Sequence, residues 1–437
     1  MTIDLTSPNL RAAVAALAPA ILRVGGSEGD KIVYDVAGDH CGPQSGAPQP
    51  VDPAFCLSME RWRELVGFAA ETGVSIVFGL NAMTFRANVS SPLVLRNIDA
   101  LLEYTARANL TVHGFELSNE LPNIAPAVCA ADYRNLAAAL RRHWPSKATR
   151  PKLIGNDLNS DETYVRAWLP LVGGALDVLT YHNYAGEGAN HTPIDEFMSP
   201  AYLDRGPQQA RGVIAAWSEL AAPRGTQLWA GEIAACWHSG QQGWTDRFGD
   251  SFWYADALAA RAALNHSAFC RQALVGGYYE LLDRATFRPN SDYYVGLLFK
   301  QLMGPTVLRT TVSHGMDPSG SLRAWAQCQT PGIVTLLLIN LSNETLYSVP
   351  IASLGISGIA GSSRFDYELS ADGLAAQTVK LNGAVLQPGH KGEIPSMSQH
   401  ARPGKGSAIL VQAHTIKFVV IEDTAAEACY PRKVDAP

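Results

Sequence analysis

Short apolar segments alternate with amphipathic segments of helical length through the first three quarters of the chain, and this alternation constrains the fold most. Such a pattern is typical of parallel βα units. Seven strands are predicted, and polar or glycine residues follow almost every one, as at the active-site face of a barrel. The strands are expected at Ile21–Val24, Val74–Leu80, Gly114–Glu120, Lys152–Gly155, Asp177–Tyr184, Gln227–Glu232 and Arg271–Gly277.

From about Pro305 the pattern changes to period-two segments separated by Gly, Ser and Asn turns, with no long helix. The clearest segments are 333–339, 364–369 and 417–421. This pattern indicates an all-β unit, expected to be a sandwich. We therefore predict an α/β fold in which a (β/α)8 TIM-type barrel spans residues 1–304 and a C-terminal β-sandwich spans residues 305–437.

Composition limits the partners that the chain can bind. Of its 437 residues, 47% are hydrophobic and 17% are charged, and the net charge is -6. An acidic balance disfavours nonspecific binding to nucleic acid and, mildly, to a highly sulfated polysaccharide. No apolar run reaches the roughly 18 residues that suggest a transmembrane segment.

Features that bear on localisation point in different directions. Six Asn-X-Ser/Thr sequons would permit glycosylation in a secreted protein, whereas no signal peptide is visible. The seven cysteines leave at least one without an intrachain partner. We expect a secreted, cell-wall or matrix protein, or one of the lysosome or vacuole, and leave association with a membrane surface open.

Two glutamates stand at corresponding places in separate predicted strands. Glu120 ends the strand that begins at Gly114, and Glu232 ends the strand that begins at Gln227. Two carboxylates at strand ends are what glycoside hydrolysis requires. The alternative for each is an ordinary loop glutamate.

Around these glutamates the chain resembles glycoside hydrolase family 79, the heparanases and β-glucuronidases. The segment Asp30–Val36 is especially similar to the plant heparanase-like branch. The matching stretches run in family order over nearly the whole chain: Leu22–Ser27, Phe78–Ala82, Phe115–Glu120, Tyr181–Tyr184, Gly231–Glu232, Asp292–Tyr294 and Leu297–Lys300.

The resemblance implies that Glu120 is the general acid/base and Glu232 the nucleophile of a retaining hydrolase. It implies that Asn119 bonds the sugar 2-hydroxyl, unless it only caps a loop, and that Tyr184 holds the nucleophile ionised. His182 is expected to line the site or to be an ordinary buried histidine. Arg23 is expected to neutralise Glu116 or Glu232, or to form a plain interior ion pair.

The same resemblance assigns substrate contacts to three further residues. Tyr279 and Gly277 match the segment that contacts the uronate carboxylate, although Tyr279 is also explained by core packing. Ser27 matches a small hydroxyl residue near the substrate. Because the segment after Glu120 (121–126) carries no basic residue, a less sulfated glucuronide fits better than heparan sulfate.

The resemblance also implies a disulfide between Cys328 and Cys429, and Cys41 and Cys56 lie close enough in sequence for a second. Free structural cysteines are the alternative. Family members have a barrel strand before the part that matches Asp4–Pro8, so the first strand is expected to be missing here. A separate N-terminal chain that supplies it is one explanation, and a shortened gene product or a barrel that tolerates the gap are others.

Taken together, the sequence predicts a retaining β-glucuronidase that acts on a glucuronic-acid-containing polysaccharide or proteoglycan. It predicts no cofactor and no metal. Two alternatives are kept: a catalytically inactive, glycan-binding heparanase-like protein, and a related retaining hydrolase that acts on another hexosyl unit.

Overall fold

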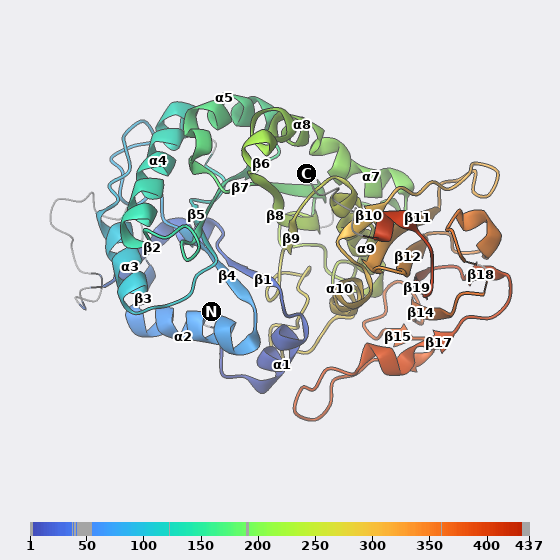
Figure 1. The fold of residues 1–437 in the computed structure, drawn as a ribbon. Helices are drawn as coiled ribbons and strands as arrows, with labels where there is room; N and C mark the ends of the chain where they lie inside the picture. Colours follow the sequence, from blue (N-terminus) through green and yellow to red (C-terminus); the bar gives the residue numbers. More distant parts are fainter. Residues whose placement is uncertain are drawn as a thin grey trace.

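A computed structural model describes residues 3–36, 38, 41, 55–121, 123–188, 192–359 and 361–430. Its first part is built on one parallel sheet that curves into a barrel, which is open on one side (Figure 1). This confirms the predicted fold class. The sheet contains, in spatial order, β1 (Ile21–Val24), β4 (Ser75–Leu80), β5 (Gly114–Leu117), β6 (Lys152–Asn159), β7 (Val178–Gly186), β8 (Gln227–Cys236) and β9 (Ala268–Arg271).

Helices form a ring outside this sheet (Figure 1). Each has local reasons to start and stop: in α2 the Ser58 hydroxyl caps the backbone N–H of Arg61, and Gly73 ends the helix at φ 73°. The helices are α1 (Pro8–Ala16), α2 (Met59–Thr72), α3 (Arg96–Arg107), α4 (Pro126–His143), α5 (Glu162–Val172), α6 (Ile194–Phe197), α7 (Pro200–Gln209), α8 (Arg211–Leu220), α9 (Phe248–Ala263) and α10 (Ser291–Leu302). The short strands β2 (Ile32–Asp35) and β3 (Phe55–Ser58) pair with each other outside the barrel.

The barrel is not closed between β1 and β9. Each of these strands has one hydrogen-bonded neighbour in the sheet, β4 for β1 and β8 for β9. A cavity of about 1120 Å³ lies between them and is lined mainly by apolar side chains of β1, β9, α1 and α10, among them Leu22, Phe269, Val14 and Phe299. The seven-strand count agrees with the sequence prediction, and the cavity lies at the open seam of the sheet.

The C-terminal part contains an eight-stranded antiparallel sheet and a separate two-stranded sheet, β13 with β18. One apolar cluster lies between the two sheets, and the opposite face of the large sheet joins the core of the barrel through α9 and α10. The division at 304/305 stays a prediction. The strands are β10 (Thr306–Leu308), β11 (Leu322–Thr330), β12 (Ile333–Asn340), β13 (Tyr347–Pro350), β14 (Arg364–Ser370), β15 (Lys380–Leu381), β16 (Ala384–Val385), β17 (Arg402–Pro403), β18 (Ala408–Val411) and β19 (Thr415–Ile421).

Several strand ends differ from the sequence prediction: β5 ends at Leu117 rather than Glu120, and β6 and β8 run on to Asn159 and Cys236. The last barrel strand ends at Arg271, so the segment 272–277 that we expected as strand is a loop. Gly276 and Gly277 there have φ of 108° and 74°, which a strand does not accept. Pro207 lies near the end of α7, and α8 begins two residues after α7 ends.

Two disulfides are present, one between Cys328 and Cys429 and one between Cys41 and Cys56. The first joins β11 to the segment after β19, and the second joins Cys41 to Cys56 in β3. Cys129, Cys236 and Cys270 are free. Within the described part of the chain, no helix is both long and apolar enough to cross a membrane.

Candidate active site

Glu120 and Glu232 meet at the carboxyl ends of the barrel strands. Glu120 follows β5 in a tight backbone turn, with φ of 74° at Ser118 and 54° at Glu120. Glu232 lies inside β8 rather than at its end, because β8 continues four residues past the predicted end. The ligand atoms of Glu120, His182 and Glu232 all lie within 4.8 Å of one another. Parallel strands therefore bring together two carboxylates that are 112 positions apart in the sequence.

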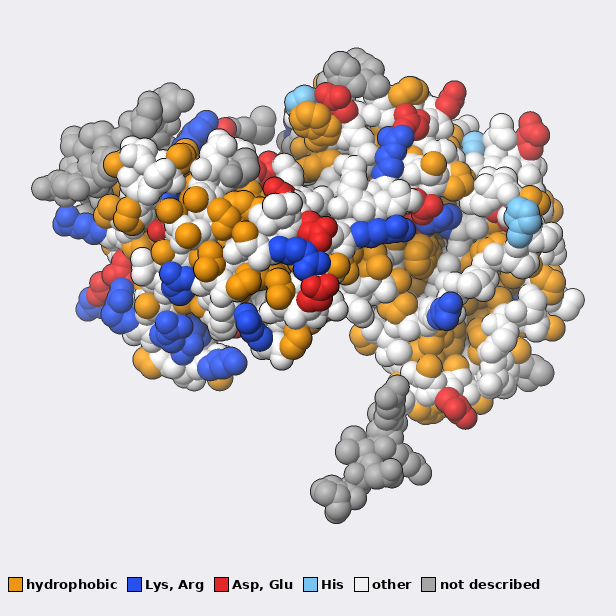
Figure 2. Space-filling model, turned by 90° about the horizontal axis from the view of Figure 1, so that it is seen from above, with side chains coloured by type: hydrophobic (Ala, Val, Ile, Leu, Met, Phe, Trp, Pro, Cys, Tyr) orange, Lys and Arg blue, Asp and Glu red, His pale blue; other side chains and the backbone are white. Residues whose placement is uncertain are grey.

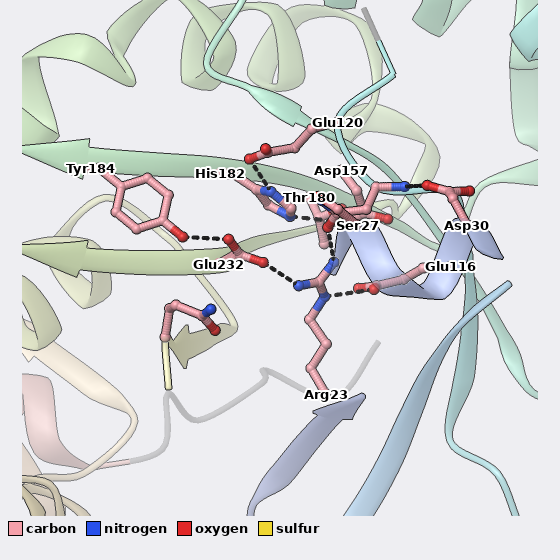
Figure 3. Close-up of polar contacts among 12 residues, drawn as sticks. Arg23, Ser27, Asp30, Glu116, Glu120, Asp157, Thr180, His182, Tyr184 and Glu232 are labelled. Atoms are coloured by element: carbon pink, nitrogen blue, oxygen red, sulfur yellow. Dashed lines mark hydrogen bonds and ion pairs between the residues drawn. The ribbon is translucent and has the colours of Figure 1, made fainter. Parts of the chain in front are cut away.

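Glu232 is held by two donors. The Tyr184 hydroxyl donates to Oε1, and Arg23 Nη1 donates to Oε2 at 2.7 Å (Figure 3). Burial by itself raises the pKa of Glu232, but the charges of His182 and Arg23 and the Tyr184 hydrogen bond lower it overall. The arrangement favours the ionised carboxylate that a nucleophile needs.

Arg23 is the central cation of the site. Its side chain is 8% exposed and stands between Glu116 and Glu232 in Figure 3. Besides Glu232, its Nε donates to Glu116 Oε2 at 2.7 Å and its Nη2 donates to Asn119 Oδ1 at 3.0 Å. Burial raises the pKa of Glu116 to about 7, although Arg23 opposes the shift. Arg23 thus pairs with both glutamates that the sequence analysis offered as alternatives.

Glu120 has a different environment from Glu232. Its side chain is 31% exposed, and Oε1 lies 2.8 Å from Nδ1 of the fully buried His182. Its backbone N–H donates to the Asp157 carbonyl at 2.9 Å. A cavity of about 370 Å³ opens beside Glu120, lined by side chains of Ser27, Asp30, Lys31, Met83, Thr84, Asn119, Glu120 and Leu121. Glu120 therefore faces space for a ligand.

Asn119 and Ser27 lie on one wall of this cavity. The Asn119 Nδ2 group is 3.4 Å from Ser27 Oγ, and the Asn119 backbone N–H donates to Asp30 Oδ2 at 2.8 Å. Asp30 also accepts from the Ala82 N–H at 2.8 Å, and its burial raises its pKa to about 6. Asp30 thereby joins the loops after β1, β4 and β5.

Tyr279 and Gly277 lie in the loop after β9. Tyr279 is 7% exposed, and its hydroxyl accepts a hydrogen bond from Gln272 Nε2 at 3.3 Å. Gly277 has φ 74°, and a Cβ there would lie 2.6 Å from the Tyr279 ring. Burial and the nearby Glu232 charge raise the pKa of Tyr279, so its hydroxyl stays a donor near Glu232.

A metal ion is not assigned to this site. Glu120, His182 and Glu232 are close enough to share one. However, His182 Nδ1 faces Glu120, and both oxygens of Glu232 already accept hydrogen bonds from Tyr184 and Arg23. A metal would have to displace these partners.

Sequence reasoning missed Asp157 and Asp30. Asp157 follows the predicted strand Lys152–Gly155 after one residue, so a polar residue near a strand end was the available signal. Asp30 stands inside the stretch with the strongest family likeness, where it was not singled out.

Comparison with known proteins places the chain in a family. The N-terminal domain of glycosyl hydrolase family 79 matches residues 1–259. The chain belongs to this family of glycosidases. It is 30% identical to heparanase-like protein 1 of Arabidopsis thaliana, covering 98% of this chain and 87% of that protein. It is 29% identical to baicalin-β-D-glucuronidase of Scutellaria baicalensis, covering 91% and 80%.

Solved structures support the fold of this family member. The GH51 arabinofuranosidase from Xanthomonas axonopodis pv. citri superposes with a TM-score of 0.65 at 15% identity, covering 94% of this chain and 89% of the other. At this identity the likeness concerns the fold alone.

The paired charges of Arg23 and Glu116 lead to a stability prediction. Arg23→Met should lower the free energy of unfolding by about 3–5 kcal/mol, because it leaves a buried carboxylate without its cation. Urea unfolding followed by circular dichroism measures this. The double variant Arg23→Met/Glu116→Gln should recover part of the loss. The control is Arg107→Met, which breaks the exposed pair with Glu103 and should change the free energy of unfolding by less than about 1 kcal/mol. An equal loss of stability in Arg23→Met and Arg107→Met would contradict the interpretation.

Proposed function

We propose that this protein is a retaining β-glucuronidase in which Glu120 is the acid/base and Glu232 the nucleophile. The observation that carries the proposal is the approach of the two carboxylates, with oxygens within 4.8 Å, in unlike environments. Retaining glycosidases hold the pair roughly 5 Å apart, whereas inverting enzymes leave room for a water molecule.

The two environments suit the two roles. Glu232 is held ionised by Arg23, His182 and Tyr184, and attacks the anomeric carbon to form a glycosyl-enzyme ester. Glu120, at the edge of the cavity, protonates the departing oxygen. In the second half-reaction Glu120 accepts a proton from the water that releases the sugar, and Glu232 leaves with the bonding electrons.

A glucuronide is supported as substrate by the loop after β9. A uronate carboxylate that enters the site needs donors, since burying it unpaired is costly. The hydroxyl of Tyr279, near Glu232, is such a donor. We propose that the backbone at Gly277 also contacts the uronate carboxylate. The name of the Scutellaria relative, a β-D-glucuronidase, agrees with this substrate class.

We propose a weakly sulfated glycan or proteoglycan rather than heparan sulfate. Among the described residues that line the cavity beside Glu120, Lys31 is the one with a basic side chain, and its Nζ lies 3.5 Å from Glu28. On the face seen in Figure 2, acidic side chains stand among the basic ones across the middle of the molecule, whereas several Lys and Arg side chains gather at the lower left. Sulfate groups gain most from clustered Arg and Lys. Two disulfides are consistent with the oxidising compartment of a secreted, lysosomal or vacuolar protein.

Variants of the two glutamates test the mechanism. The wild type should hydrolyse p-nitrophenyl β-glucuronide with retention of configuration, seen by proton NMR. Glu232→Gln should lower kcat by at least about 10³-fold on every substrate. Glu120→Gln should lose about 10²–10⁴-fold on an alkyl glucuronide but far less on a dinitrophenyl glucuronide, whose leaving group needs no proton.

Retained activity in Glu232→Gln, or an inverted product, would overturn the mechanism. A folded wild type that binds but never hydrolyses β-glucuronides would favour the inactive glycan-binding alternative.

Tyr279 tests the substrate class. Tyr279→Phe should lower kcat/KM for p-nitrophenyl β-glucuronide by about 10- to 100-fold, since a hydrogen bond to a charged group contributes about 1.5–3 kcal/mol. The matched control is Tyr278→Phe, at an exposed neighbouring position, which should behave like wild type. A wild type that prefers p-nitrophenyl β-glucoside would support the alternative of another hexosyl unit.

We further propose that an extended apolar segment of a separate chain occupies the seam between β1 and β9. It is supported by the outer edges of β1 and β9, which have no strand partner among the described residues, and by the mainly apolar cavity of about 1120 Å³.

In the chain by itself, backbone amides of β1 and β9 should exchange hydrogen faster than those of β5. Hydrogen–deuterium exchange read by mass spectrometry measures this. The same amides should be protected in protein isolated from its natural source together with a second chain. Equal protection of β1, β9 and β5 in the isolated chain would show that the barrel tolerates the gap.

A further inference from the structure

Asp157 touches the acid/base glutamate through its backbone. It lies in β6 with φ 55°, a conformation that non-glycine residues adopt rarely, and is completely buried. Its carbonyl accepts the Glu120 N–H at 2.9 Å. The position of Asp157 therefore constrains the turn that carries Glu120.

The Asp157 carboxylate lies beyond His182 as seen from Glu120. Thr180 Oγ1 donates to Asp157 Oδ1 at 2.6 Å, and the same oxygen lies 3.7 Å from His182 Nε2. In the described part of the chain, His182 Nε2 and Asp157 Oδ2 have no hydrogen-bond partner. Because Nε2 is buried and 3.7 Å from Oδ1, the Asp157 carboxylate is an available partner for the His182 Nε2–H group.

His182 therefore lies between two carboxylates, with Nδ1 at 2.8 Å from Glu120 Oε1 and Nε2 toward Asp157 (Figure 3). Other charged groups around it are Arg23, Glu232 and Glu116. Burial by itself lowers the pKa of His182, but Asp157 and Glu120 raise it to about 9, against the opposing charge of Arg23. The imidazolium form is thus stable next to the acid/base.

Given the assignment of Glu120 as acid/base proposed above, we propose that Asp157 is a positioning residue that keeps the Nε2 proton on His182. Nδ1 is then the position that exchanges a proton with Glu120, and the two groups hold the catalytic proton jointly. An isolated, partly exposed glutamate would lose its proton near neutral pH. His182 beside Glu120 thereby keeps a proton available for the leaving group at that pH.

The proton balance closes over one turnover. The proton moves from His182 Nδ1 to the Glu120 carboxylate, and from there to the glycosidic oxygen as the C–O bond breaks and its electrons stay on that oxygen. Glu232 supplies the electron pair of the new bond. In hydrolysis Glu120 takes a proton from water and returns it to Nδ1. Asp157 takes no proton in any of these steps, and Nε2 keeps its proton.

Histidine NMR titration tests the pair without any substrate. The His182 signal, identified among the 11 histidines by its absence in His182→Asn, should titrate above the ordinary value of about 6.5. Asp157→Asn should lower this pKa by about 1–3 units. The matched control is Asp99→Asn, which removes the carboxylate 2.8 Å from His143 and should leave the His182 signal unchanged.

Kinetics provide the second readout. In Asp157→Asn the alkaline limb of kcat/KM against pH should move to lower pH, and kcat should fall about 10- to 100-fold with KM within about twofold. If Asp157→Asn does not fold, His182→Asn, which can still donate one hydrogen bond to Glu120, should show the same displaced limb.

Either of two results would overturn the proposal. One is a wild-type His182 that titrates at or below about 6.5. The other is a folded Asp157→Asn variant in which the His182 titration and the alkaline limb of kcat/KM against pH are both unchanged. Failure of the wild type to hydrolyse any β-glucuronide would instead overturn the proposed function, since the NMR titration still decides the role of Asp157.

Discussion

The buried guanidinium of Arg23 is the interaction on which the site depends. Four acidic side chains, Glu116, Glu120, Asp157 and Glu232, come together inside one end of the barrel, and such a cluster is unfavourable unless cations compensate it. Arg23 bonds two of these carboxylates and the amide of Asn119. Its planar fork of donors allows several contacts at once, which a lysine would not.

The second cation, His182, divides the acidic cluster into parts with different chemistry. Arg23 and Tyr184 hold Glu232, whereas His182 faces Glu120 on one side and Asp157 on the other. Two glutamates of identical intrinsic acidity thus have different charged and hydrogen-bonding neighbours. This division corresponds to the two roles that a retaining mechanism assigns.

The scaffold holds these groups although its sheet is open. Strands β4 to β8 lie away from the seam, and they carry or precede most of the charged side chains of the site. The helices around these strands pack into a core that continues into the C-terminal sheet. Arg23 is the exception, because β1 borders the seam. Whether the seam between β1 and β9 is filled therefore affects the position of Arg23 more directly than that of Glu120.

The sequence by itself determined the alternation of strands and helices, the change to antiparallel β-structure and the two glutamates, since these depend on local periodicity and family motifs. It misplaced the last barrel strand, because glycines with positive φ break an apolar segment that looks continuous. Only the tertiary structure decided that Arg23 bonds Glu116 and Glu232 together, and that Asp157 reaches His182. These contacts depend on the register between parallel strands, which joins residues 25 to 209 positions apart and leaves no pattern in a single chain.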